Sequence, residues 1–111
     1  RVQIAERRLE LTRRLVGREF DALTAAEQRA AQRIGVLARH ASAAAEALRT
    51  VRAEEEAGRV SADVVLEREL NVETIDIEMQ VARLQQLRLQ LRLLGLFGAL
   101  DVNALSRQLN G

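Results

Sequence analysis

The segment Ala57-Gly58-Arg59-Val60-Ser61 decides the fold, because it can both end one helix and start another. Gly58 can adopt the left-handed conformation in which helices often terminate. Ser61 can cap a following helix, and Asp63 puts a negative charge near its positive end. The segment therefore predicts a tight reversal at residues 58–61, with residues 20–56 antiparallel to residues 62–94.

The residues before this turn predict one long helix over residues 1–57. Most are good helix formers, the chain has no proline, and Gly17 and Gly35 are the weak points. Thr24 and Glu27 match a capping box, which leaves a helix restart open, but we favour a continuous helix. From residue 16 to residue 51 the apolar positions recur every 3.5 residues on average, which is the coiled-coil period. These positions are Val16, Phe20, Leu23, Ala26, Ala30, Ile34, Leu37, Ala41, Ala44, Leu48 and Val51.

After the turn, the pattern predicts a second helix over residues 62–94, interrupted by Gly95 and Gly98. A short helix is expected over residues 102–109, with Asp101 or Asn103 as its cap. The predicted fold is all-α, a long antiparallel helical hairpin of coiled-coil type with a short C-terminal helix, in one domain over residues 1–111.

Composition excludes several functional classes. All 17 basic residues are arginine, against 16 acidic residues, and the formal net charge is +1. The two signs are interleaved, which disfavours nucleic-acid binding. There is no cysteine and one histidine, His40, so we expect no catalytic, cofactor or metal site. No apolar run is long enough to cross a bilayer. The chain opens on Arg1, so we expect a processed chain or a piece of a larger protein.

The second helix carries two apolar stripes, more than one partner helix can cover. The first, here called the leucine stripe, consists of Leu66, Leu70, Ile77, Leu84 and Leu91. The second, here called the valine stripe, consists of Val65, Val72, Ile75, Met79, Ala82, Leu89 and Leu93. We expect the first helix to cover the leucine stripe. The large residues of the valine stripe (Val65, Val72, Ile75, Met79, Leu89 and Leu93) are then predicted oligomer contacts, through which the chain self-associates.

Residues 54–70 (EEEAGRVSADVVLEREL), continued to Leu93-Leu94-Gly95, resemble the repeat of the TolC-family outer-membrane efflux proteins. In that repeat a long helix ends in a Gly-x-x-Ser turn, and a second helix opens on an aliphatic triplet and ends at Leu-Gly. Residues 4–9 (IAERRL) and 18–27 (REFDALTAAE) are similar to the family's long helix leading to the tip. The resemblance covers nearly the whole chain.

The resemblance implies a homotrimer whose hairpins form a closed helical tube in the periplasm of a Gram-negative bacterium, below the outer-membrane part of a channel. It also implies that the tip binds a periplasmic adaptor protein through Gly58, Arg59, Val60, Ser61 and Asp63. Without the resemblance, the tip is more simply a connector. Glu54, Glu55 and Glu56 oppose the helix dipole there, and either a partner's cations or solvent with Arg52 and Arg59 can compensate.

These observations give two hypotheses of different classes. The first is the periplasmic coiled-coil part of a TolC-like channel in a tripartite efflux or secretion system, with no enzymatic activity. The alternative is a free-standing structural coiled-coil module that binds other proteins and has no role in transport.

Overall fold

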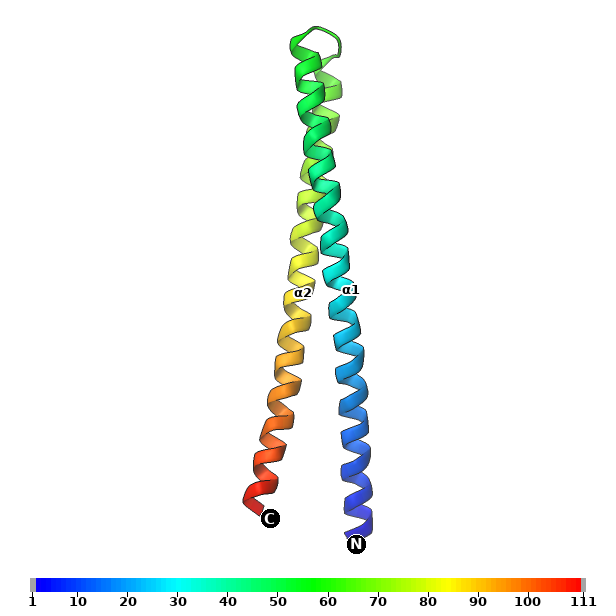
Figure 1. Cartoon of the computed structure of the whole chain (residues 1–111), viewed down its shortest axis with the longest axis vertical. Helices are drawn as coiled ribbons and strands as arrows, with labels where there is room; N and C mark the ends of the chain where they lie inside the picture. Colours follow the sequence, from blue (N-terminus) through cyan, green and yellow to red (C-terminus); the bar gives the residue numbers. More distant parts are fainter. Residues whose placement is uncertain (1, 111) are drawn as a thin grey trace. The chain divides into compact units, whose positions relative to one another are not determined.

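Over residues 2–110 the computed structural model contains two helices joined by one turn (Figure 1). It describes the backbone of residues 2–110 and the side chains of residues 2–99, 107 and 109. Helix α1 runs Val2–Glu56 and helix α2 runs Ala62–Asn110. The prediction of an all-α antiparallel hairpin with its reversal at residues 58–61 is confirmed, and Arg1, the first residue of the predicted helix, lies outside the described residues.

The predicted interruption of the second helix is wrong. Helix α2 continues through Gly95 and Gly98 to Asn110, so residues 102–109 are its last turns rather than a separate short helix. A glycine inside a helix costs about 1 kcal/mol relative to alanine, and the helical bonds of the flanking leucine-rich turns outweigh that cost. Proline, which would remove a bond outright, is absent from the chain.

Helix α1 is also continuous through the possible restart at Thr24. The Thr24 hydroxyl donates a hydrogen bond of 2.8 Å to the carbonyl of Phe20, one turn earlier in the same helix. This is a common mid-helix use of a threonine side chain, and it takes the place of the predicted cap. The choice of continuity over a restart is therefore confirmed.

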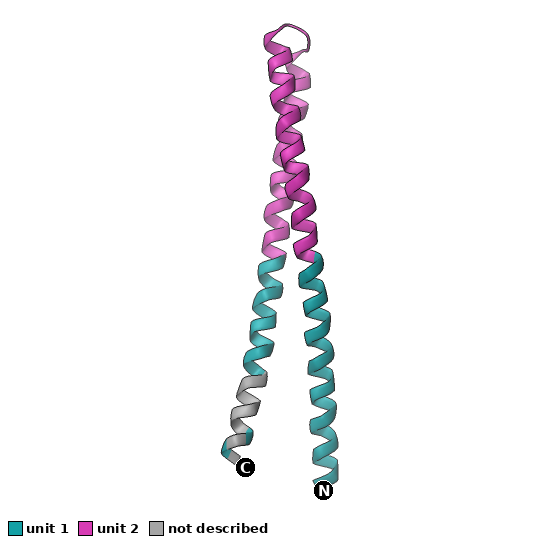
Figure 2. Cartoon of the chain, viewed as in Figure 1, with its two compact units in different colours: residues 1–29, 86–111 teal, residues 30–85 magenta. Residues whose placement is uncertain are grey.

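The chain divides into two compact units, shown in different colours in Figure 2. Unit 2, residues 30–85, contains the turn and the helix segments on either side of it. Its core is a narrow seam between the two segments, with Leu37 packed on Met79 and Ala82 and with Ile34 beside them. Other buried residues of unit 2 are Ala44, Val51 and Val65. The α1 residues among these belong to the predicted apolar series, which confirms that face of α1 within unit 2, whereas Phe20 of the same series, in unit 1, is 36% exposed.

Unit 1 consists of residues 1–29 and 86–111. Leu23 is buried in it, and the half-buried Glu27 joins its two helix segments. A carboxylate oxygen of Glu27 accepts hydrogen bonds from the side-chain amides of Gln86 at 3.2 Å and Gln90 at 3.4 Å. Glu27 lies seven residues before Ile34 and Gln86 seven residues after Met79, so both occupy core-facing positions. Unit 1 therefore contains a polar layer where the pattern calls for apolar side chains.

Candidate functional site

The turn between the helices is a complete Schellman motif. Gly58 has a φ of 75°, in the left-handed region, as its predicted role requires. The Arg59 amide donates to the Glu54 carbonyl at 2.8 Å, and the Gly58 amide donates to the Glu55 carbonyl at 2.9 Å. These two bonds satisfy carbonyls that the end of α1 would otherwise leave unpaired. The tip is therefore a defined structure rather than a loose loop.

The start of α2 lies at the predicted residues, but among the described residues no hydrogen bond joins the Ser61 hydroxyl to a backbone amide, so the predicted side-chain cap is not seen. Ser61 immediately precedes the helix, and its carbonyl accepts a hydrogen bond of 3.2 Å from the Val64 amide. Asp63 lies in the first turn of α2, where a carboxylate interacts favourably with the positive end of the helix dipole. The two helix ends at the tip are thus both stabilised locally.

The five predicted tip residues lie together at this end of unit 2. Gly58, Arg59, Ser61 and Asp63 are exposed, and Val60 is half-buried. A guanidinium, a hydroxyl and a carboxylate are thereby presented within six residues of chain. Polar groups of this kind are usual at the rim of a protein interface. Adaptor binding by these residues stays a prediction.

The acidic end of α1 conflicts with the helix dipole. Glu54, Glu55 and Glu56 form most of the last turn, which contains no basic residue. The nearby Arg52 is paired with Glu69 of α2 at 3.3 Å, so its guanidinium is directed across the hairpin. Negative charge at a helix C-terminus is unfavourable by a few tenths to about 1 kcal/mol per residue. The three glutamates at the tip therefore lower the stability of the end of α1, and they are not explained by the needs of the helix itself.

The predicted stripe at the contact with α1 is wrong: the valine stripe, and not the leucine stripe, packs against α1 in unit 2. In unit 2, Val65 and Met79 of the valine stripe are buried, with exposed fractions of 7% and 9%, and Ala82 has 2%. Val72 and Ile75 are half-buried, as are Leu89 and Leu93 in unit 1. The valine stripe is therefore the face that packs within the chain, and its buried members Val65 and Met79 offer almost no surface for the predicted oligomer contacts. Oligomer contacts by the half-buried members stay a prediction.

The leucine stripe is the uncovered one. In unit 2, Leu66, Leu70, Ile77 and Leu84 have exposed fractions of 53%, 54%, 61% and 50%, and Val81 beside them has 50%. Each residue turns a helix by about 100°, so Leu70 and Ile77 point about 200° away from Val72 and Met79, two residues further on. The leucine stripe thus lies on the back of α2, opposite α1. Exposed apolar side chains that line one face of a helix often mark a binding site.

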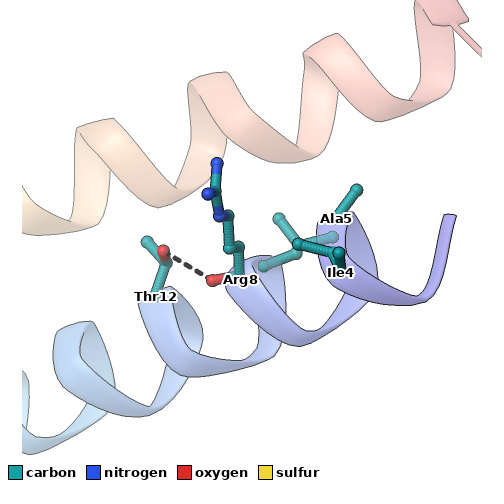
Figure 3. Close-up of a pocket in the computed structure, with 5 residues that line it drawn as sticks. Ile4, Ala5, Arg8 and Thr12 are labelled. Atoms are coloured by element: carbon teal, nitrogen blue, oxygen red, sulfur yellow. Dashed lines mark hydrogen bonds between the residues drawn. The ribbon is translucent and has the colours of Figure 1, made fainter. Parts of the chain in front are cut away.

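Other surface features are weaker candidates. In unit 2, His40 lines a shallow surface groove with Ala43, Ala44 and Arg68, among others. In unit 1, a shallow depression lies along the first turns of α1, where Figure 3 shows Ile4, Ala5, Arg8 and Thr12 with the hydrogen bond from the Thr12 hydroxyl to the Arg8 carbonyl. Neither feature brings together groups for catalysis. Among the described residues, no cluster of three or more His, Cys, Asp or Glu side chains could hold a metal ion.

The described part of the chain contains no helix that is long and apolar enough to span a membrane. Comparisons with models of known protein families, with curated proteins and with solved structures found no match to this chain.

Proposed function

We propose that this chain is the periplasmic coiled-coil part of a TolC-like outer-membrane channel, and that it docks onto a periplasmic adaptor protein through the hairpin tip. The proposal combines the resemblance of residues 54–70 with one structural observation. That observation is the capped, exposed tip, in which the Schellman bonds hold Arg59 and its neighbours in a fixed geometry. A preorganised turn binds a partner with less loss of conformational entropy than a flexible loop does.

The two apolar faces of α2 support the same proposal. A helix within a closed ring of helices has a neighbour on each side, and it needs an apolar stripe for each neighbour. The valine stripe packs on α1, and the leucine stripe of unit 2 is left for an adjacent hairpin. In this proposal three subunits form the ring, substrate passes through it passively, and contact with the membrane is made by segments other than these 111 residues.

The experiment that tests docking is a charge reversal at the tip, Arg59→Glu, in the intact channel protein. We expect weaker crosslinking to the adaptor and reduced export, with trimer assembly unchanged, since a rim charge acts mostly on partner encounter. Arg39→Glu is the matched control, because Arg39 is an exposed arginine on α1 of the same unit, away from the turn. Normal crosslinking and export in the Arg59→Glu variant would contradict tip docking.

The alternative is a free-standing coiled-coil interaction module. The observation that favours it is the uncovered leucine stripe, which can bind another helical protein without any channel. The parent reading frame separates the two proposals. A signal peptide and a second hairpin of similar sequence would support the channel component, and their absence from the complete frame would support the module.

A further inference from the structure

The leucine stripe of unit 2 needs a partner that offers a similar apolar surface. Four of its residues, Leu66, Leu70, Ile77 and Leu84, are at least half exposed, and Val81 widens the same surface. The spacing of seven residues from Leu70 to Ile77 to Leu84 keeps these side chains on one line along α2. A partner helix with matching spacing can therefore pack along it.

Helix α1 does not offer such a surface. Within the described side chains of its unit 2 segment, Val36 is the one exposed large apolar residue, at 40%. The neighbouring outward positions hold Gln32, Arg39, Glu46 and Arg49. The matching apolar surface in this chain is the leucine stripe itself, on a second copy of α2.

The charges along α2 determine the direction of that pairing. The first part of the helix carries six acidic residues and one arginine, which are Asp63, Glu67, Arg68, Glu69, Glu73, Asp76 and Glu78. The following part carries three arginines and no acidic residue over residues 79–98, which are Arg83, Arg88 and Arg92. Parallel pairing would set acidic segment against acidic segment and basic against basic. Antiparallel pairing sets each acidic segment against a basic one, and the contact is then symmetric.

We propose that two copies of this chain associate through their leucine stripes, with the two α2 helices antiparallel. The boundary between the acidic and basic segments, near Gln80, then lies close to the symmetry axis. This inference concerns the 111-residue chain by itself and does not rest on the proposed function. It uses the same stripe as the proposed ring but points the two tips in opposite directions, so one copy of the stripe takes part in either the ring contact or this dimer contact.

The first experiment measures self-association of the chain by sedimentation equilibrium over a wide concentration range. We expect a concentration-dependent dimer, and the double variant Ile77→Ser/Leu84→Ser should raise the dissociation constant by at least about tenfold. Val36→Ser is the matched control, since it removes an exposed aliphatic side chain from α1 of the same unit, and it should leave the constant unchanged. Circular dichroism of each variant checks that the helices are retained, as expected for changes at exposed positions.

The second experiment determines the direction of pairing. The chain has no natural cysteine, so Ala62→Cys or Gln85→Cys provides a single exposed labelling site in unit 2. Helices rise about 1.5 Å per residue, so position 62 lies about 27 Å from Gln80 along α2. In an antiparallel pair centred there, the two labels at 62 are about 54 Å apart along the axis, whereas two labels at 85 are close. With a dye pair of short transfer distance, we expect energy transfer between copies labelled at 85 and none between copies labelled at 62.

Three results would overturn the proposal. A strict monomer at high concentration would mean that the leucine stripe is reserved for a different protein. Unchanged association in the Ile77→Ser/Leu84→Ser variant would place the contact elsewhere on the chain. Equal energy transfer at positions 62 and 85 would show parallel pairing, in which the charge segments do not determine the direction.

Discussion

The guanidinium of Arg52 in α1 lies 3.3 Å from a carboxylate oxygen of Glu69 in α2, and this ion pair links the two helices close to the tip. Both side chains are about half exposed, at 56% and 43%. Ion pairs with this exposure contribute at most about 1 kcal/mol, because water and salt screen them.

A double-mutant cycle on Arg52→Ala and Glu69→Ala should therefore give a coupling free energy of about 0.2 to 1 kcal/mol that falls as salt is added. Thermal or urea unfolding measures it. The pair Arg39→Ala and Glu69→Ala provides the control and should be additive, because Arg39 lies more than three turns earlier in α1. A coupling well above 1 kcal/mol, or one unaffected by salt, would contradict this description.

Replacing Gly58 tests the tip conformation. Gly58→Val should destabilise the chain by about 1 to 2 kcal/mol, because an L-residue with a side chain resists the left-handed backbone. A Cβ at this position meets no atom within 4 Å, so backbone strain is the expected cause of the loss. Gly35→Ala is the control: it also meets nothing within 4 Å but lies inside α1, and it should stabilise by about 0.5 to 1 kcal/mol. Thermal melts that show no difference between the two variants would count against the left-handed turn.

A paired comparison on α2 tests which stripe faces α1. Met79→Ala should destabilise the chain by about 2 kcal/mol or more, since Met79 is buried against Leu37 and Ala82. Ile77→Ala should change stability in dilute solution by less than about 0.5 kcal/mol, because Ile77 is 61% exposed. Urea unfolding at low protein concentration measures both changes. The opposite order of the two effects would restore the sequence-based assignment of the stripes.

A substitution at Gly95 tests whether α2 is continuous through that residue. Gly95→Ala should increase helix content and raise stability by up to about 1 kcal/mol, since alanine is favoured over glycine inside a helix and its Cβ meets no atom within 4 Å. Circular dichroism and thermal melting are the measurements. A loss of stability would indicate that the helix is interrupted at Gly95, as the sequence pattern suggested.

The polar layer of unit 1, formed by Glu27, Gln86 and Gln90, should lower the free energy of unfolding while fixing how the two helix segments align. Gln86→Leu should destabilise the chain by about 1 kcal/mol, because it removes one of the two amides that donate to the half-buried Glu27. The double variant Glu27→Leu/Gln86→Leu should be more stable than the original chain, as for other polar residues at core positions of coiled coils. Unfolding curves of the single and double variants provide the test. A double variant less stable than the original chain would mean that the layer is favourable in itself.

The turn and the core face of α1 could be predicted from sequence because each depends on a local signal. Gly58 ends α1 through its own backbone preference, and Ser61 directly precedes α2. The apolar series of α1 has one dominant face, which is buried in unit 2. Helix α2 has two apolar faces with similar spacing, and spacing alone does not say which one meets α1. Which face of α2 meets α1 depends on how the Schellman turn orients the start of α2. That orientation is set by three-dimensional packing and not by the spacing of apolar residues.

The break predicted at Gly95 failed for a related reason. Propensity assigns a cost of about 1 kcal/mol to each glycine, whereas the cooperative hydrogen bonds of a long helix decide whether it continues. Among the predicted docking residues, Arg59 and Asp63 are exposed at the tip, and their role in adaptor binding stays a prediction.

The seven-residue repeat of the seam in unit 2 limits how a hairpin of this kind can change in length. Deleting seven residues from one helix removes two turns, so the remaining apolar side chains still face the seam. The other helix is then longer than its partner by about 10 Å. Deleting seven from each helix keeps every remaining side chain in its layer and leaves the tip intact. Insertions or deletions of two or five residues would rotate the polar face into the seam. Natural or engineered variants of this hairpin should therefore differ in steps of fourteen residues, shared equally between α1 and α2.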